Sequence, residues 1–428
     1  MSLTYFWIFI ILLATGAPVV FALLIGPGLS LLLDRQPEFY MALLSRLYNG
    51  MNSFPLMAVP FFILAGEVMN AGGVTASLVR LSQSMIGHLR GGLAQVNILS
   101  SVLFAGLSGS AVADTSALGK TLVPAMEKEG YSRSFAAAIT AASSVIGPII
   151  PPSGIMILYA FVMNVSVAGL FAAGLVPGIL VCIGLMTVTA VLAKRRNYPV
   201  AAKRASWSQR GRTLLQSLPA LMTPVILLGG ILAGAFTPTE AAAIAAVYAI
   251  FLSVFVMKTL TIAQLPAIFI NAATQSGIIL MLVGAAVTFS WIITVSGMAV
   301  SIAETFTQIS DNVYVLLLLV NLFLFVIGMF LDAGPAILIL GPVLAPVFVN
   351  LGIDPLHFAI VMCVNLTVGL ATPPMGLVLF VASSISGEKP DKIAVEMAPF
   401  LLVEIAVIFL ITFAPAVSMT LPKLLGLA

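Results

Sequence analysis

Long apolar stretches with few charged positions recur along the whole chain of 428 residues. Many of them approach the roughly 20 residues that an α-helix needs to cross a membrane. The strict alternation of apolar and polar residues that a transmembrane β-strand requires is absent from these stretches. The pattern therefore predicts an all-α integral membrane protein, with apolar helices near residues 2–14, 17–33, 49–71, 133–161, 167–193, 214–235, 239–257, 276–297, 356–384 and 396–422.

Two further apolar stretches, 92–127 and 313–350, are interrupted near their middles by small or polar residues. The interruptions read "GLSGSAVADT" at 106–115 and "GMFLDAGPAI" at 328–337. Two half-length helices joined in this way predict a re-entrant hairpin. A different interruption, "GPIIPPSG" at 147–154, contains prolines, which lack a backbone N–H and break a helix. Within hydrocarbon, such a break must be buried in protein or line a polar cavity.

The two halves of the chain repeat one another at a shift of 222 positions. Under this shift "GPIIPPSG" coincides with "GLATPPMG", and both contain a Pro-Pro pair at the same place. The other coincidences are Gly106 with Gly328, Gly119 with Gly341, Pro124 with Pro346, Gly130 with Gly352, Gly147 with Gly369 and Gly154 with Gly376. Helices that were alike only in composition would share Leu and Ala instead. We therefore expect two repeats, each with three helices, a hairpin, a broken helix and a last helix.

The most polar segment, 194–212, holds seven Lys and Arg residues and no acid. Under the positive-inside rule this loop is cytoplasmic. Residues 2–33 are taken as two helices, because the repeat aligns 15–18 with a later turn. Counting membrane crossings outward from this loop gives the two halves opposite orientations. The first hairpin then opens to the cytoplasm and the second to the outside, and both termini lie outside. Two amphipathic segments, 76–91 (basic) and 298–312 (acidic), are expected to lie in the cytoplasmic and outer interfaces.

Composition agrees with a chain embedded in the membrane throughout, because 61% of the residues are hydrophobic and only 8% are charged. The net charge of +3 gives no reason to expect a nucleic-acid partner. Cys182 and Cys363 fall within apolar stretches and are expected to be reduced packing residues. "DTSALGKT" at 114–121 lacks the first glycine of a P-loop, and the sequence has no credible catalytic triad or His/Cys cluster. These features argue against an enzyme.

The interruptions offer many oxygen atoms and few nitrogen atoms. The first hairpin tip contains Ser108 and Ser110, and the second contains Asp332. Pro152 and Pro374 lack the N–H that a continuous helix would supply. Backbone carbonyl groups are expected to be freed at Gly147 and Ile150 and at Gly369 and Thr372. Carbonyls, hydroxyls and one carboxylate suit a hard monovalent cation such as Na⁺.

Inverted repeats with discontinuous helices are typical of secondary transporters, whose sites lie near the membrane midplane. The N-termini of half-helices favour an anion, so the pattern predicts a Na⁺-coupled carrier of an anionic solute. The alternative is that the breaks only bend the helices and that the serines bond their own backbone. Asp332 argues against this alternative, since an intramembrane carboxylate marks a functional site by default.

Some polar residues near these sites allow two interpretations. Asp114 and Ser153 lie next to the expected ion sites and could contact the solute, or could serve in capping and hairpin packing. Glu67, Asn70 and Glu240 lie near expected helix ends. For Glu67 and Glu240 we favour simple solvation of the helix end.

Three segments of the sequence resemble the large membrane subunit of tripartite ATP-independent periplasmic (TRAP) transporters. They are "FPLMAVPFFILAGEVMNAGG" at 54–73, "FAGLSGSAVADTSALG" at 104–119 and "GPIIPPSG". The resemblance covers essentially the whole chain and is greatest to the sialic acid branch. It implies an elevator-type fold of the ion-transporter superfamily in a bacterial inner membrane. It also implies a separate small four-helix membrane subunit, a periplasmic binding protein, surrounding membrane lipid, and uptake of a carboxylate driven by two or more Na⁺ ions.

The resemblance further implies two Na⁺ sites, the second of which matches through the repeat more than through a direct motif. The first would use Ser108, Ser110, Gly147, Ile150 and Pro152, and the second Gly328, Asp332, Gly369, Thr372 and Pro374. It divides the chain into scaffold helices with a first arm (1–91), the two halves of a transport domain (92–161 and 313–384), further scaffold helices with a second arm (162–312) and a C-terminal helix (385–428).

One alternative stays open, a standalone Na⁺-coupled carrier of a dicarboxylate or an inorganic anion in the same superfamily. The short first helix, near 2–14, favours a membrane partner, because it leaves a thin edge of the scaffold that needs cover. A membrane-embedded enzyme and a channel are both disfavoured.

Overall fold

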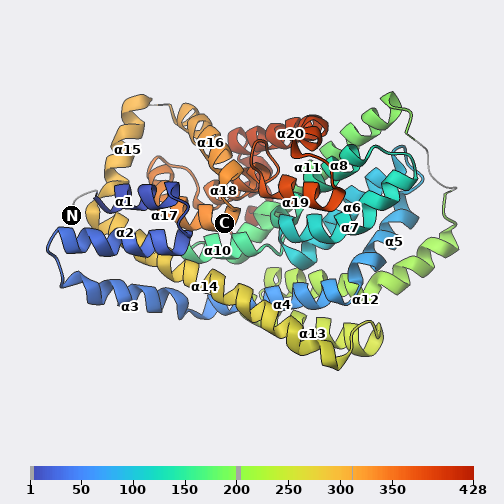
Figure 1. The fold of residues 1–428 in the computed structure, drawn as a ribbon, viewed down its shortest axis with the longest axis horizontal. Coiled ribbons are helices and arrows are strands. Elements are labelled where there is room, and N and C mark those ends of the chain that lie inside the picture. Colours follow the sequence, from blue (N-terminus) through green and yellow to red (C-terminus); the bar gives the residue numbers. More distant parts are fainter. Residues whose placement is uncertain (1–3, 199–203, 311) are drawn as a thin grey trace.

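A computed structural model describes residues 4–198, 204–310 and 312–428. Within these ranges every regular element is a helix, and several helices, including α2, α3 and α14, run along the long axis of the molecule (Figure 1). Nine of the described helical segments are long and apolar enough to cross a membrane. The chain is therefore a multi-pass helical membrane protein, which confirms this part of the prediction.

The helices follow the order that the apolar pattern predicts, with a few additions. The first half contains α1 (Thr4–Ala14), α2 (Val19–Leu33), α3 (Phe39–Met51), η1 (Phe54–Met57), α4 (Ala58–Ala71), α5 (Val74–Ile86), α6 (Gly92–Ser108), α7 (Ala111–Lys128), α8 (Arg133–Ser144), α9 (Ile146–Ile149), α10 (Gly154–Met163) and α11 (Val167–Arg195). The second half contains α12 (Trp207–Leu232), α13 (Pro238–Phe251), η2 (Leu252–Val256), η3 (Ile262–Gln264), α14 (Leu265–Ser296), α15 (Met298–Ile309), α16 (Val313–Phe330), α17 (Ala333–Asn350), α18 (Pro355–Gly369), α19 (Leu377–Ser386), α20 (Pro390–Phe413) and α21 (Ala416–Leu424).

The prediction of one helix over 49–71 is wrong, because this stretch contains the end of α3, the short η1 and then α4. Pro55 explains the interruption, since it has no N–H to donate to the carbonyl of Met51, the last residue of α3. The division of 2–33 into two helices is confirmed. α1 and α2 are separated by a turn in which Gly16 has φ +82°, a conformation that favours glycine.

The two hairpins and the two broken helices are present where the sequence predicts them. Hairpin 1 consists of α6 and α7 and turns at Gly109 and Ser110; hairpin 2 consists of α16 and α17 and turns at Leu331 and Asp332. The first break separates α9 from α10, and the second separates α18 from α19. The Pro-Pro peptide bond in each break is cis.

The secondary structure repeats with the same shift as the sequence. A shift of 222 positions places α7 on α17 residue for residue, and α8 and α18 begin at matching positions. Ser110 and Asp332 match as the residues that cap α7 and α17. In Figure 1, α7 and α17 lie on opposite sides of the centre of the molecule. The inverted orientation of the two halves in a membrane stays a prediction.

Helix packing brings the hairpins and the broken helices into one group. α7 packs against α8 and α19, and α17 packs against α10 and α18. A second group is formed by α4, α13 and α14 with α2 and α3. α11, which the expected division places with the scaffold, packs against α6, α9, α18 and α20. Which of these groups moves stays a prediction.

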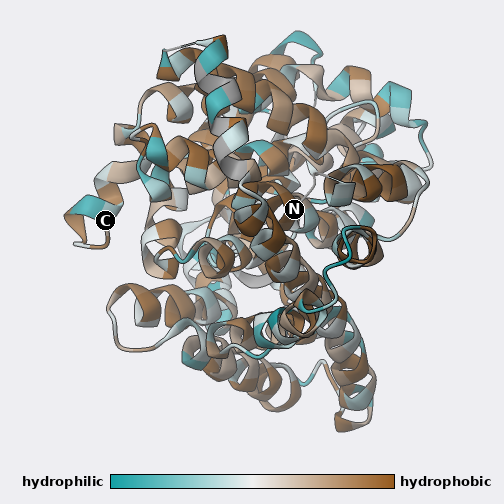
Figure 2. Ribbon diagram, turned by 90° about the vertical axis from the view of Figure 1, so that its left-hand side faces the viewer, coloured by the Kyte–Doolittle hydropathy of each residue, from teal (hydrophilic) through white to brown (hydrophobic). Residues whose placement is uncertain are grey.

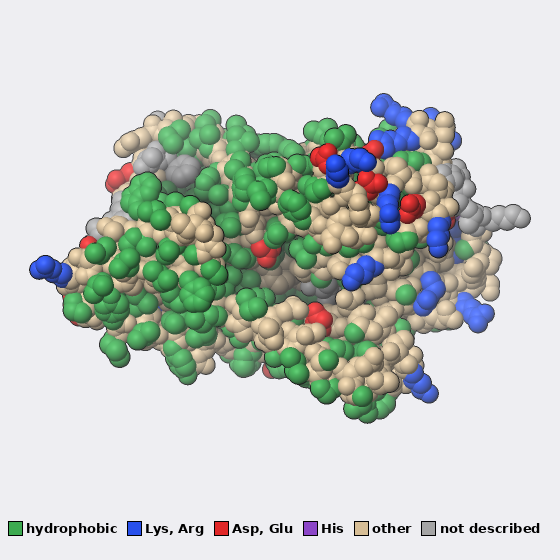
Figure 3. Space-filling model, in the orientation of Figure 1, with side chains coloured by type: hydrophobic (Ala, Val, Ile, Leu, Met, Phe, Trp, Pro, Cys, Tyr) green, Lys and Arg blue, Asp and Glu red, His purple; other side chains and the backbone are tan. Residues whose placement is uncertain are grey.

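The molecular surface is that of a membrane-embedded chain. Hydrophobic residues dominate most helices in Figure 2, and large apolar side chains such as Trp7, Leu32 and Val247 are more than half exposed. Basic side chains gather at the right-hand end in Figure 3, where α7 ends, α8 begins and α11 ends. This charge distribution agrees with a cytoplasmic location of that end. Of the basic loop 194–212, residues 199–203 lie outside the described part.

Candidate functional site

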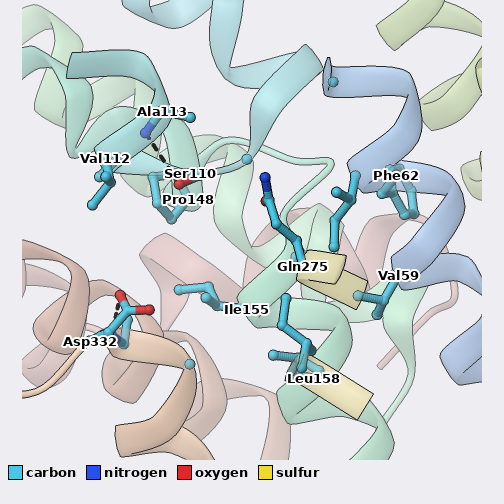
Figure 4. Close-up of a pocket in the computed structure, with 18 of the residues that line it drawn as sticks. Val59, Phe62, Ser110, Val112, Ala113, Pro148, Ile155, Leu158, Gln275 and Asp332 are labelled. Atoms are coloured by element: carbon cyan, nitrogen blue, oxygen red, sulfur yellow. Dashed lines mark hydrogen bonds between the residues drawn. The ribbon is translucent and has the colours of Figure 1, made fainter. Parts of the chain in front are cut away.

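A cavity of about 530 Å³ lies where the two hairpin tips, the two breaks and helices α4 and α14 meet. The face in Figure 3 is hollowed near its middle, and acidic side chains border the hollow. Figure 4 shows Ser110, Pro148 and Asp332 on one side of the cavity and Val59, Phe62 and Gln275 on the other. The cavity is large enough for a small organic solute.

The tip of hairpin 1 packs directly on the first break. Gly109 has φ +58°, and a Cβ atom there would lie 3.0 Å from the carbonyl oxygen of Pro152 and 3.2 Å from the backbone nitrogen of Gly154. Glycine is therefore required both by the left-handed backbone and by the close approach. Ser110, the next residue, caps α7 by accepting a hydrogen bond from the N–H of Ala113 (3.4 Å), shown as a dashed line in Figure 4.

Behind this tip, Gly147 brings the first break against α7. A side chain at Gly147 would overlap Oδ2 of Asp114. In a continuous helix, residues 151 and 152 would donate to the carbonyls of Gly147 and Pro148, but both are prolines without an N–H. The first break therefore presents backbone oxygen beside a buried carboxylate.

Ile150 ends α9 with an extended backbone (φ −83°, ψ 123°), which turns its carbonyl away from the helix axis. α11 holds it there, because a side chain at Gly178 would overlap that of Ile150. Four of the five residues of the first expected Na⁺ set therefore cluster around one hairpin tip and one break. The side chain of Ser108 is outside the described part of the structure.

The second expected set is assembled around a contact between two glycines. A Cβ atom on Gly328 of α16 would lie 3.0 Å from Cα of Gly369, the last residue of α18. The Gly369 carbonyl accepts the N–H of Thr372 at 2.9 Å, and the Thr372 carbonyl accepts the N–H of Gly376 at 3.1 Å. Each carbonyl oxygen retains one lone pair for a cation. Asp332 caps α17 through Oδ1 and the N–H of Ala333 at 2.9 Å.

The two sets differ in how they meet the cavity. Ser110, Pro152 and Asp332 line it, whereas Gly147, Ile150 and the glycines of the second set lie behind its wall. Pro374 is exposed.

Four helices begin at the cavity and bring partial positive charge to it. The first residues of α7, α10, α17 and α19 all line it, namely Ala111, Gly154, Ala333 and Leu377. Helix N-termini carry partial positive charge and unpaired N–H groups. The charged side chains among the described lining residues are Glu67 and Asp332, and none of the described lining residues is Lys, Arg or His. Among the described lining residues, the positive partial charge at the cavity therefore comes from backbone N–H groups.

A comparison with known protein families identifies the family to which this architecture belongs. The family model of the tripartite ATP-independent periplasmic transporter, DctM component, matches residues 6–417. The chain belongs to this family. It is a TRAP transporter large permease and not an enzyme, and large permeases of this kind are inner-membrane proteins that work with a small membrane subunit and a periplasmic binding protein.

Several curated relatives match over nearly their whole lengths. The uncharacterized protein YgiK of Salmonella typhimurium is 43% identical, covering 97% of this chain and 96% of that protein. The sialic acid TRAP transporter large permease protein SiaM of Vibrio cholerae is 38% identical, covering 96% of each. The C4-dicarboxylate TRAP transporter large permease protein DctM of Rhodobacter capsulatus is 37% identical, covering 100% of each. The solutes of the relatives therefore differ.

Solved structures with the same fold are transporters. The YdaH transporter of Alcanivorax borkumensis has a TM-score of 0.64 at 17% identity, covering 89% of this chain and 88% of that one. MtrF of Neisseria gonorrhoeae, from a class of antimetabolite efflux pumps, has a TM-score of 0.61 at 14% identity, covering 88% and 85%. At these identities the likeness concerns the fold alone.

Within this TRAP permease, the two residues expected to contact a solute are both fully buried. Ser153 caps α10 by accepting the N–H of Met156 at 3.4 Å, and Asp114 lies against Gly147. Neither lines the cavity.

Three polar residues of the wall formed by α4 and α14 were missed or misjudged from the sequence. Glu67 lines the cavity with Asn70 and Gln275, and its Oε1 accepts a hydrogen bond from Nε2 of Gln275 at 3.1 Å. Solvation of a helix end is therefore the wrong interpretation for Glu67. Glu240 is exposed at the start of α13, where it forms a capping box with Thr237. The spacing of Glu67 and Asn70, three residues apart on one helix face, was an available signal.

Proposed function

We propose that this chain is the large permease of a Na⁺-driven importer of an organic carboxylate, completed by a separate four-helix membrane subunit and a periplasmic binding protein. Sialic acid is the first solute to test, because sequence segments resemble the sialic acid branch and SiaM is a relative that matches over nearly its full length.

The observation that carries this proposal is the charge pattern of the cavity. Four helix N-termini meet there, the described lining includes two acids, and it includes no basic side chain. An anionic solute would be attracted by the helix N-termini and repelled by Glu67 and Asp332. Bound cations would remove the repulsion on the Asp332 side, so binding of the anion would depend on binding of Na⁺.

Two ions are proposed, one in each half. The first would lie between the tip of hairpin 1 and the carbonyls of Gly147 and Ile150. The second would lie between Asp332 and the carbonyls of Gly369 and Thr372. Backbone carbonyls, a hydroxyl and a carboxylate are the oxygen ligands that hard cations prefer.

An elevator motion is proposed for the step that carries the solute across the membrane. The close contacts of Gly109 with Pro152 and of Gly328 with Gly369 would keep each tip and break together as one unit. The opposite wall, on α4 and α14, is largely apolar and contributes few hydrogen bonds, so the unit could slide past it. The arms of this motion would be α5 and α15.

The test is uptake of sialic acid into proteoliposomes that contain this chain and its small subunit, with the binding protein outside. Uptake is expected with an inward Na⁺ gradient and not when K⁺ replaces Na⁺. Na⁺-dependent uptake without the binding protein would favour a standalone carrier. No uptake of sialic acid, with uptake of another carboxylate, would correct the solute and leave the Na⁺-coupled importer standing.

A further inference from the structure

Glu404 is a buried carboxyl group in the middle of α20 that the proposed import cycle does not use. Its exposed fraction is 0%. Neither of its carboxylate oxygens accepts a hydrogen bond from any donor in the part of the chain that the structure describes. An ionised carboxylate in a low-dielectric interior is strongly destabilised unless it is paired or hydrogen-bonded. Glu404 therefore requires a bound cation or a bound proton.

Helices α8 and α11 pack on α20 next to Glu404. One turn earlier, the ring of Phe400 packs against Phe135 of α8, with 5.9 Å between the ring centroids. The preceding residue, Val403, packs so closely on α11 that a side chain at Gly184 would overlap it. α20 also contacts α18, α19 and α21. The immediate neighbours along the helix are thus apolar.

The titratable groups on these helices do not pair with Glu404. The described groups are Arg133 on α8, Cys182, Lys194 and Arg195 on α11, His357 and Cys363 on α18, Lys423 on α21, and Asp391, Lys392 and Glu396 on α20 itself, whereas α19 has none. The charged ones stand at or near helix ends. Arg133 pairs with Glu127 at 3.4 Å, and His357 contacts the carbonyl of Thr412 at 3.3 Å. No described cation compensates a charge on Glu404.

We propose that Glu404 is a proton-binding site of this permease, and that release of its proton is coupled to the first break. A protonated carboxyl group needs no counter-charge, and its O–H can donate to a backbone carbonyl of its own helix. A metal cation would need several oxygen ligands around it. In the part of the chain that the structure describes, neither Glu404 oxygen has a hydrogen-bond partner, and no group of three or more His, Cys, Asp or Glu side chains could hold a metal ion.

The coupling follows from the helices that pack next to Glu404. The role of this coupling in transport rests on the proposed function. α8 leads directly into α9 and the first break. α11 lies against the same break, since a Cβ atom at Gly174 would be 2.6 Å from the carbonyl oxygen of Ile149 and a side chain at Gly178 would overlap Ile150. Ionising Glu404 would draw water or a counter-ion between α8 and α11. It would therefore displace the two helices that position Ile150.

The protonation of Glu404 is tested by infrared difference spectroscopy on the purified complex of this chain with its small subunit. Glu404→Gln keeps the size of the side chain and removes the acid. The wild type is expected to show a protonated-carboxyl band at neutral pH that Glu404→Gln lacks. Glu396→Gln is the matched control on the same helix and should retain the band, because Glu396 is ion-paired with Arg196 at 2.6 Å. This measurement needs neither solute nor binding protein.

Identical carboxyl bands in the wild type and Glu404→Gln would overturn the proposal. So would a missing band together with fewer bound Na⁺ ions in Glu404→Gln, which would make Glu404 a cation ligand. If Glu404→Gln does not fold, Glu404→Asp serves instead, since it should shift the frequency of the band. An unshifted band in that variant would overturn the assignment.

The coupling is tested by the pH dependence of uptake in proteoliposomes. Wild-type uptake is expected to fall about tenfold for each pH unit above its midpoint, as the acid ionises. Glu404→Gln, a permanent mimic of the protonated form, is expected to lose this alkaline limb, whereas Glu396→Gln keeps it. The same alkaline limb in Glu404→Gln and the wild type would overturn the coupling.

Discussion

At the scale of single residues, glycines decide whether the hairpin tips can reach the breaks. Gly109 and Gly147 allow hairpin 1 to meet the first break, and Gly328 meets Gly369 at the second. In each case the space that a Cβ atom needs is already filled, by backbone atoms or by the Asp114 carboxylate. These positions therefore control the distances between the oxygen atoms proposed to hold Na⁺.

Replacing Gly147 with Ala is expected to weaken the apparent Na⁺ affinity of uptake at least about tenfold, equivalent to about 1.4 kcal/mol. The added methyl group would displace Asp114 and open the first site. The Na⁺ concentration dependence of uptake measures this. Gly229→Ala is the control, because Gly229 is exposed on α12 with no atom near its Cβ direction. Equal Na⁺ dependence of the two variants would contradict the first site.

Asp332 has two separable roles, as the cap of α17 and as the proposed carboxylate ligand. Asparagine is as good a helix cap as aspartate. Asp332→Asn should therefore keep the melting temperature near that of the wild type while Na⁺-driven uptake falls at least about tenfold. Asp332→Ala should lose uptake and also about 1 kcal/mol of stability with the cap. Normal Na⁺ dependence in Asp332→Asn would exclude the carboxylate from the second site.

At the scale of elements, the two helix breaks distinguish this fold from a simple helical bundle. Each break ends one helix and starts another with its N-terminus at the cavity. The same local feature would therefore supply backbone carbonyls for the proposed cations and a helix N-terminus for the proposed anion.

Pro152→Ala should partly re-close the first break, since it restores an N–H that can donate to the carbonyl of Pro148. We expect a weaker apparent Na⁺ affinity and a folded protein. Pro399→Ala is the matched control, because Pro399 lies inside the continuous helix α20. If the Na⁺ affinity of Pro152→Ala equals that of Pro399→Ala, the break only bends the helix.

The hairpins and breaks could be predicted from the sequence because glycine and proline act on the backbone locally, whatever packs around them. Helix α3 could not be predicted in the same way, because its Arg46 and Asn49 make it too polar to be recognised as a membrane helix. Glu67 was misjudged for a different reason. Its role depends on Gln275, which lies 208 positions away and approaches only through the packing of α4 on α14.

At the scale of the whole molecule, opposite ends should face opposite sides of the membrane. In Figure 1, the connection between α2 and α3 and the start of α12 lie at opposite ends of the molecule. Glu38 belongs to the first of these segments and Ser208 to the second. Both side chains are exposed.

In a variant without Cys182 and Cys363, a membrane-impermeant thiol reagent added to intact cells should label Glu38→Cys and not Ser208→Cys. After the cells are permeabilised, the reagent should label both cysteine variants. Labelling of Ser208→Cys in intact cells would reverse the orientation assigned from the basic loop 194–212.

The central claim is that at least two Na⁺ ions accompany one carboxylate through the cavity, so that each cycle carries net positive charge inward. The most direct measurement is solute uptake into proteoliposomes at a fixed Na⁺ gradient while the membrane potential is varied. An interior-negative potential should accelerate uptake, and solute addition should produce an inward positive current. Uptake that is independent of the potential and produces no current would contradict the claim.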